Sequence, residues 1–300
     1  IHETIGPKFA YYAGWTYWAC HITYIASKGS GGLKALSWMV FQDGSTYDTF
    51  PTIGVQLATL GVFLFFCWVA SRGLNPLKKL ATLAGTSMFV MSILYIVMMF
   101  AAPIINPNGG YLSMDFSWDN IIPQFNVNYF TSLSILVFAV GGCEKISPYV
   151  NKVKDPAKGF PKGMIALTII VMVCAILGTI AMGMMFDPAL INGSTESFNS
   201  YVSNGSYWAF QKLGEYYHVG NLLMIIYAAC NAIGQFSTLV VSIDAPLRML
   251  LDNEDARQFI PTKLLKQNKF GAYINGIWMV VALSGAIILI QIIGGSGAAG

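Results

Sequence analysis

Residues 80–114 read LATLAGTSMFVMSILYIVMMFAAPIINPNGGYLSM and contain no Asp, Glu, Lys or Arg. An apolar helix needs about 20 residues to cross the roughly 30 Å hydrocarbon core of a bilayer. Further uncharged runs lie at 9–27, 49–71, 120–143, 163–186, 216–243 and 270–300. The composition agrees, because 55% of the residues are hydrophobic and only 10% are charged, against about 25% charged in an ordinary soluble domain. The pattern predicts an all-α polytopic membrane protein.

The predicted spans form a single transmembrane domain over residues 1–300. We expect the helices at about 9–41, 52–71, 80–102, 128–150, 163–186, 219–247 and 271–295, with outer loops at about 104–127 and 187–215. The five cysteines all fall in predicted spans, where a cysteine behaves as a small apolar residue. The chain starts with Ile1 and stops just after an apolar run, so we expect a fragment of a longer membrane protein.

Charged residues in the loops alternate in sign along the chain. Because Lys and Arg accumulate in cytoplasmic loops, the basic loops after the second, fourth and sixth spans place the start of the chain in the cytoplasm. The expected location is the plasma membrane, crossed several times. The basic groups are Arg72, Lys78 and Lys79; Lys152, Lys154, Lys158 and Lys162; and Arg248, Arg257, Lys263, Lys266 and Lys269.

The fourth span is interrupted by FAVGGCEKISP at 138–148. Adjacent glycines weaken a helix by about 1 kcal/mol each, and Pro148 removes a donor and crowds the carbonyl of Glu144. Broken backbone survives in a membrane only where it is packed in protein or lines a cavity. Freed N–H and C=O groups at such a break can hold a zwitterionic amino acid. The alternative is a simple Gly/Pro kink near the cytoplasmic end.

The motif Gly142-Cys143-Glu144, preceded by Phe138, resembles the sixth helix of the amino acid–polyamine–organocation (APC) transporters. The loop DPAKGFPK at 155–162 resembles the family's N-P-x-x-x-x-P loop, with Asp155 in place of Asn. Gly6-Pro7 before GWTYW at 14–18 resembles the start of its third helix, and DAPLR at 244–248 its eighth-helix exit. The branch most similar is that of the bacterial glutamate/GABA antiporter-type amino acid permeases.

This resemblance implies a LeuT-like inverted-repeat fold, of which the chain would cover about helices three to nine of twelve. It implies that substrate meets the Phe138 ring and the backbone of Val140, Gly141, Gly142 and Cys143. Glu144 would brace the unwound turn or carry a coupling proton. The third-helix stretch contributes pocket residues in the family, which implies substrate contacts for Cys20, His21 and Tyr24.

Other polar residues in the predicted spans are candidates for gating or coupling, since polar groups are expensive in lipid. Lys28 follows His21 and Tyr24 on one helical face; it is either an intramembrane charge or the outer end of a short helix. His21 has a second interpretation as a hydrogen-bonded core residue. Asn231 and Gln235 could line the pathway or bond across helices. Asp244 and Arg248 could form a cytoplasmic ion pair or an inner gate.

The favoured function is a secondary active amino acid transporter, an antiporter that works by alternating access. The alternative is a proton-coupled symporter; a seven-helix receptor or an intramembrane enzyme is a more distant one. The uncharged middle of the third span favours exchange, because some relatives place a lysine there in place of sodium. The expected partners are an amino acid or amine, the lipid bilayer and, as one arrangement, a second copy in a homodimer.

Several other functions lack sequence support. The chain has no H-E-x-x-H, G-x-S-x-G or G-x-x-x-x-G-K-[ST] motif. Its histidines, His2, His21 and His218, are scattered, so no metal site follows. We expect no enzyme activity, no cofactor and no nucleic-acid partner.

Overall fold

A computed structural model describes most of the chain. The described residues are 6–114, 148–150, 153–191, 193–252 and 257–294, with Ser117, Trp118, Ile122, Phe125, Val127, Tyr129, Phe130 and Leu133 between them. Almost the whole of the expected fourth span, including the 138–147 break, therefore lies outside the described residues.

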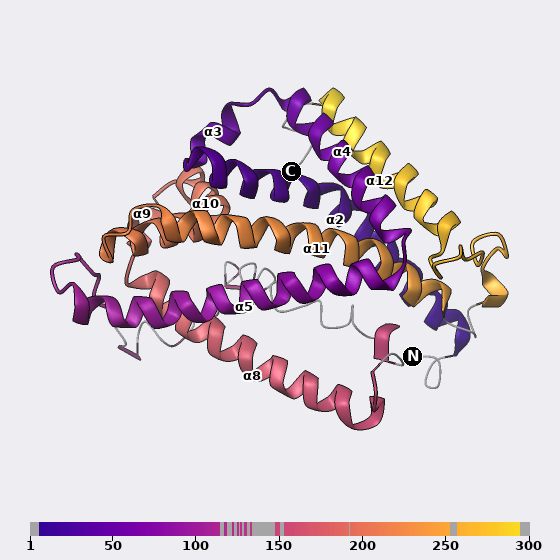
Figure 1. Cartoon of the computed structure of the whole chain (residues 1–300), viewed down its shortest axis with the longest axis horizontal. Helices are drawn as coiled ribbons and strands as arrows, with labels where there is room; N and C mark the ends of the chain where they lie inside the picture. Colours follow the sequence, from indigo (N-terminus) through magenta and orange to yellow (C-terminus); the bar gives the residue numbers. More distant parts are fainter. Residues whose placement is uncertain are drawn as a thin grey trace. The chain divides into compact units, whose positions relative to one another are not determined.

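Helices dominate the described residues, as the uncharged runs predicted (Figure 1). The helices are α2 (Pro7–Phe41), α3 (Gly44–Thr49), α4 (Thr52–Ala70), α5 (Leu74–Ile105), α8 (Pro156–Gly183), α9 (Pro188–Ile191), α10 (Thr195–Tyr216), α11 (Leu222–Leu251), the 3-10 turn η2 (Arg257–Phe259) and α12 (Ile274–Gly294). The described residues contain no named β-strand, and only an isolated bridge joins Gln267 to Tyr273.

Five of these helices are long and apolar enough to cross a membrane: Thr52–Ala70, Leu74–Ile105, Pro156–Gly183, Leu222–Leu251 and Ile274–Ile293. The helix α2 is longer than any of these five, but it is not apolar enough to be counted with them. Its lysines Lys28 and Lys34, and the serines and glycines of residues 27–32, lower its apolar character. That α2 spans the membrane therefore stays a prediction.

Some helices begin earlier than the uncharged runs suggested. The helix α8 starts at Pro156, because the Asp155 carboxylate accepts a hydrogen bond from the backbone N–H of Lys158 at 3.3 Å. This is an N-cap, and aspartate and asparagine serve equally well in that position. The departure from the family's Asn at this loop is therefore conservative for the start of α8.

The expected outer loop at 187–215 is largely helical, which corrects the sequence analysis. Its Asn, Ser and Gly content suggested a loop, yet α10 fills most of it. The Ser194 hydroxyl caps α10 by accepting from the backbone N–H of Ser197 at 3.0 Å. Tyr207, Phe210 and Leu213 recur at helical spacing and are buried, so one apolar face holds an otherwise polar helix in place.

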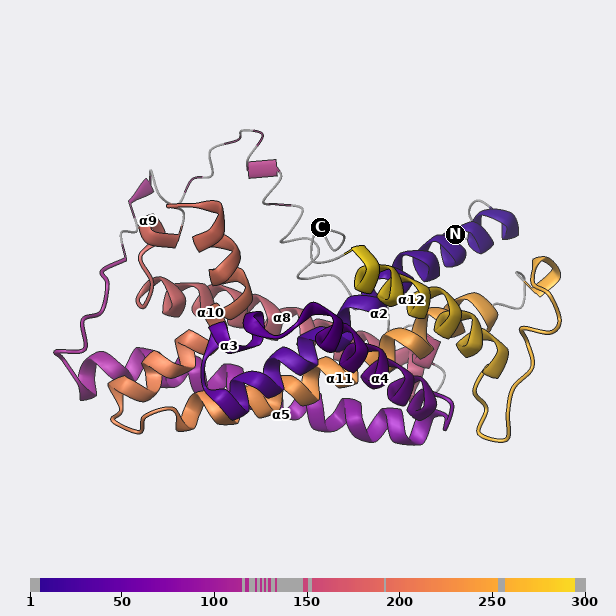
Figure 2. The same ribbon diagram turned by 90° about the horizontal axis from the view of Figure 1, so that it is seen from above.

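The chain divides into two compact units, residues 1–89 with 225–300, and residues 90–224. In the first unit, α12 runs alongside α4, and both pack on α2 (Figures 1 and 2). The core of this unit joins α2, α4, α11 and α12. Fully buried members with large side chains are Ile25, Phe63, Leu239, Ile243, Leu247, Leu251 and Ile288.

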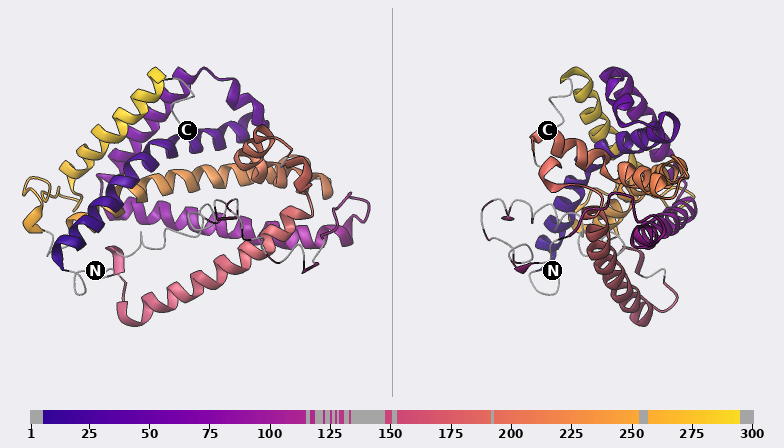
Figure 3. Two further views of the ribbon diagram at one scale, coloured as in Figure 1. Left: turned by 180° about the vertical axis from the view of Figure 1, so that it is seen from behind. Right: turned by 90° about the vertical axis from the view of Figure 1, so that its left-hand side faces the viewer.

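In the second unit, the turn after α8 is held by contacts from α5 and α10. The Tyr95 hydroxyl lies 3.3 Å from the Met185 sulfur, and the Lys212 ammonium donates to the Met185 carbonyl at 2.7 Å. The Tyr217 hydroxyl donates to the Met98 carbonyl at 2.7 Å. The helix α8 itself is one long rod (Figure 3) on which Ala181 is the one buried side chain among the described residues. Exposed apolar side chains suit a helix that is solvated by lipid.

Gly73 closes the turn between α4 and α5 and should not tolerate a side chain. Its φ is +84°, and a Cβ atom there would lie 2.3 Å from the Phe270 carbonyl oxygen. We expect Gly73→Ala to lower the free energy of unfolding by about 1–2 kcal/mol or more, measured by SDS titration in mixed micelles. The matched control is Gly85→Ala in α5, where a Cβ meets nothing within 4 Å; an equal loss in both variants would contradict this explanation.

Candidate functional site

The strongest sequence candidates lie outside the described residues. They belong to the 138–147 break in the fourth span and are Phe138, Val140, Gly141, Gly142, Cys143 and Glu144. Their assignment to the substrate site stays a prediction. The other candidates lie on α2 and α11, in the first unit.

One face of α2 brings together an aromatic and basic set, as the helical spacing predicted. The Tyr17 and His21 ring centroids are 4.3 Å apart, and the His21 and Tyr24 centroids are 5.8 Å apart. The His21 Nδ1 atom lies 2.8 Å from the Tyr17 carbonyl oxygen. His21 is therefore hydrogen-bonded within its own helix and only partly buried, and its role at the substrate site stays a prediction.

Lys28 continues the same face. Its ammonium lies 4.6 Å from the centre of the Tyr24 ring, within the range of a cation–π interaction. The side chain is partly buried and lies well inside α2, which runs from Pro7 to Phe41. Of the two readings offered for Lys28, the outer end of a short helix is wrong, because the helix continues to Phe41.

Asn231 and Gln235 lie one turn apart on α11. The Gln235 side chain donates from Nε2 to the side-chain Oδ1 atom of Asn231 at 3.3 Å. Gln235 also faces α2, since a Cβ atom at Gly31 would lie 3.3 Å from its Oε1 atom. Gly31 is three residues after Lys28 and shares its helical face. The amide pair thus lies beside the face of α2 that carries the cation.

Cys20 is exposed and is a free thiol. It precedes His21 in α2, so its side chain points about 100° away from the Tyr17–His21 face. The described structure does not bring Cys20 together with His21, Tyr24 and Lys28. Its contact with substrate stays a prediction from the resemblance.

Asp244 and Arg248 form the expected ion pair, with 2.6 Å between the Arg248 Nε and Asp244 Oδ2 atoms. Both side chains are buried. The guanidinium also donates to the Gly271 carbonyl at 3.1 Å and approaches Asp252 to 4.0 Å. These bonds tie the end of α11 to the chain before α12.

Tyr273 completes this network, and neither Tyr273 nor Asp252 was among the residues predicted from the sequence. Its hydroxyl donates a short hydrogen bond to the Asp252 carboxylate. Burial, and then this bond, raise the pKa of Tyr273 above its usual value, so the hydroxyl keeps its proton at neutral pH. The spacing of Asp252 four residues after Arg248 was a usable signal; nothing in the pattern indicated Tyr273.

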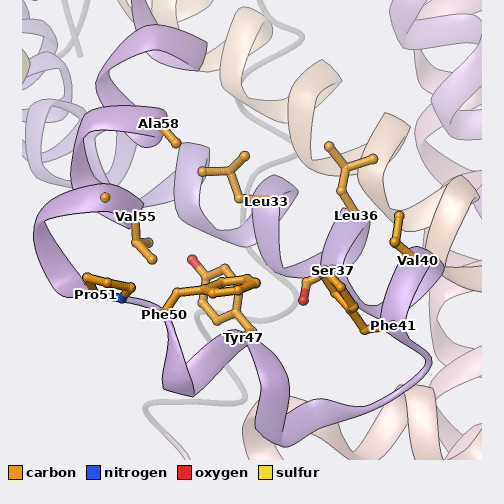
Figure 4. Close-up of a pocket in the computed structure, with 11 residues that line it drawn as sticks. Leu33, Leu36, Ser37, Val40, Phe41, Tyr47, Phe50, Pro51, Val55 and Ala58 are labelled. Atoms are coloured by element: carbon orange, nitrogen blue, oxygen red, sulfur yellow. The ribbon is translucent and has the colours of Figure 1, made fainter.

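An apolar groove lies between the C-terminal half of α2, α3 and the start of α4 (Figure 4). Its volume is about 530 Å³, and it contains no charged side chain. Such a surface suits an acyl chain or another helix better than a zwitterion. Its lining residues are Leu33, Leu36, Ser37, Val40, Phe41, Tyr47, Phe50, Pro51, Gly54, Val55 and Ala58.

The described residues contain no group of three or more His, Cys, Asp or Glu side chains that could hold a metal ion. Where α2 and α11 meet, the polar groups are the Lys28 ammonium and the Asn231–Gln235 amide pair, and such groups can bind an organic anion. The sequence model of a family described as "Amino acid permease" matches residues 1–299. The chain belongs to the amino acid permease family. This membership confirms the resemblance drawn from the sequence motifs and the all-α, LeuT-like fold that it implied.

The chain is similar to several named transporters. It is 44% identical over 98% of its length to the aspartate/glutamate permease AcaP of Lactococcus lactis, and covers 59% of that protein. It is 22% identical over 98% of its length to the inner membrane transporter YjeM of Escherichia coli, and covers 62% of it. A D-serine/D-alanine/glycine transporter of Escherichia coli is 25% identical over 56% of this chain, which covers 34% of that transporter.

The two relatives that match over 98% of this chain are longer than it, and the chain spans roughly three fifths of their length. No solved structure matches the chain. These relatives are named as permeases or transporters and not as enzymes, in agreement with the expectation that the chain is not an enzyme. The chain is thus a membrane protein of a family whose named members move small molecules.

Proposed function

We propose that the protein containing this chain is a secondary active transporter of acidic amino acids, working as an exchanger by alternating access. The observation that carries the proposal is the 44% identity, over 98% of the chain, to a relative named an aspartate/glutamate permease. The location that fits is the plasma membrane, with the basic loops and the start of the chain in the cytoplasm.

The residues that we propose to meet substrate fall in two separate sets, one in the 138–144 segment of the interrupted span and one on the polar face of α2. In this arrangement the backbone of Val140 to Cys143 holds the α-amino and α-carboxylate groups, as freed helix ends can. Phe138 covers the substrate, and Glu144 braces the turn or carries a proton. Support comes from α2 and α11, where a cation and two amides lie inside long helices, a placement that is costly in a helix that crosses lipid.

The ion pair of Asp244 and Arg248 acts, in this proposal, at the cytoplasmic end of α11. Its bond to Gly271 and its approach to Asp252 hold the end of α11 to the chain before α12, as a closed inner gate requires. Asn231 and Gln235 lie further along the same helix and line the path. These gating roles go beyond the observed contacts. Transport rates of variants at these positions test them, whereas unfolding measurements do not.

The test is counterflow in proteoliposomes containing the protein with its complete coding sequence. We expect labelled aspartate to enter vesicles preloaded with aspartate or glutamate, and to enter empty vesicles at least about tenfold more slowly, because exchange requires a substrate on each side. Vesicles without protein are the control. Uptake into empty vesicles that follows an imposed pH gradient would replace exchange with proton symport. If folded protein takes up none of a panel of amino acids, the assignment as an amino acid transporter is wrong.

A further inference from the structure

Lys28 is the most unusual charge among the described residues of the first unit. It lies inside a long helix and is partly buried, and Tyr24 supplies its ring contact. Among the residues that the structure describes, no carboxylate forms an ion pair with it. By contrast, Arg248 is buried beside Asp244. A partly buried ammonium needs an anion to offset its loss of hydration.

The surroundings of Lys28 are suited to a carboxylate. Tyr24 carries a hydroxyl donor on the same face of α2 as Lys28. Gln235 of α11 lies beside Gly31, which is also on this face of α2. Asn231 holds the Gln235 amide through a hydrogen bond of 3.3 Å. A carboxylate accepts several such bonds at once, and hydrogen bonds to charged groups are about twice as strong as neutral ones.

We propose that Lys28 binds the side-chain carboxylate of the substrate and so sets the preference for aspartate and glutamate over their amides. This inference rests on the proposed function and adds to it the residue that distinguishes the second negative charge. The α-carboxylate and α-ammonium groups are common to all amino acids, so a selective site needs a cation placed for the side chain alone. Tyr24 orients Lys28 and acts as a positioning residue.

Lys34 provides a matched comparison within α2. It is also a lysine, but its ammonium lies 5.8 Å from the Tyr47 ring of α3, and Asp48 is close enough to interact with it electrostatically. Lys34 thus has an acidic neighbour of its own. A substrate carboxylate would add little at Lys34, while it would be the counter-ion of Lys28.

The test compares aspartate with asparagine, which has the same shape without the charge. Affinity is measured as substrate-dependent thermal stabilisation of the purified complete protein, and KM by uptake in proteoliposomes. We expect Lys28→Met to weaken aspartate by about ten- to a hundredfold while leaving asparagine unchanged or improved. Lys28→Arg should keep the preference for aspartate, and Lys34→Met should leave both affinities as in the unsubstituted protein.

Three outcomes would overturn the inference. One is a wild-type protein that binds aspartate and asparagine equally. Another is a Lys28→Met variant that retains the wild-type ratio of affinities. The third is an equal loss of both ligands, which would indicate an ion pair within the protein or a failure of folding. Failure of the proposed function is distinguishable, because the unsubstituted protein would then neither bind nor take up any amino acid.

Discussion

Replacing Arg248 by methionine should lower the free energy of unfolding by about 3–5 kcal/mol. The substitution deprives the buried Asp244 carboxylate of a guanidinium 2.6 Å away and removes the bond to the Gly271 carbonyl. A buried charge that loses its partner costs much more than the intact pair contributes. The measurement is unfolding of the purified protein in mixed micelles titrated with SDS.

The double variant Asp244→Leu with Arg248→Met separates charge from packing. Replacing both partners by apolar residues of similar size is often neutral, so the double variant should recover most of the loss. Arg72→Met is a control, because Arg72 is exposed and stacks on Trp68 at 4.5 Å; its loss should cost about 1 kcal/mol or less. If the double variant is as unstable as the single one, the bond to Gly271 and not the ion pair holds this end of α11.

Gly214→Ala should destabilise the second unit by about 3 kcal/mol or more, because no space for a side chain exists there. A Cβ atom at Gly214 would lie 1.9 Å from the Gly220 carbonyl oxygen. The close approach comes from a Schellman motif at the end of α10. Val219 donates to the Gly214 carbonyl at 2.9 Å, His218 donates to the Glu215 carbonyl at 3.2 Å, and His218 has φ +55°.

The control for this variant is Gly178→Ala in α8, where a Cβ atom meets nothing within 4 Å. Alanine favours a helix over glycine by about 1 kcal/mol, so this change should be neutral or slightly stabilising in the same SDS titration. A Gly214→Ala protein as stable as the Gly178→Ala protein would show that the turn after α10 moves aside easily. The contacts of Tyr217 with α5 would then not depend on this turn.

Charge-free length decided most of the helices correctly, because lipid leaves helices as the one structure that satisfies each backbone group within its own segment. The ends were less predictable. The helix α5 begins at Leu74 and includes Lys78 and Lys79, which a search for uncharged runs excludes. Lysines extend from helix ends toward the interface, so a helix can outlast its apolar run.

The helix α10 shows the limit of composition. Its Asn, Ser and Gly residues suggested a loop, whereas the spacing of Tyr207, Phe210 and Leu213 carried the helical signal. Residue type dominated that interpretation, and periodicity would have corrected it. The helix α10 follows the rules of helices in soluble proteins, including a hydroxyl cap at Ser194.

The sequence could predict which candidate residues share a face of one helix, but not which residues of separate elements touch. Tyr17, His21, Tyr24 and Lys28 share a face because three- and four-residue steps fix it. The contact of Gln235 with Gly31 could not be read from the sequence, since it depends on how two helices meet. The bond from Tyr273 to Asp252 has the same origin, because a loop brings its partners together.

Gly31 and Gly32 give α2 a stretch without side chains where α11 passes. A Cβ at Gly32 would lie 2.2 Å from the Phe236 ring, which itself stacks on Phe66 at 5.0 Å. The packing of the Phe236 ring against Gly32 therefore sets the distance between Lys28 on α2 and the Asn231–Gln235 pair on α11. If Lys28 recognises a substrate carboxylate as proposed, the substrate preference also depends on Gly31 and Gly32, and exchanging either glycine for alanine would alter it.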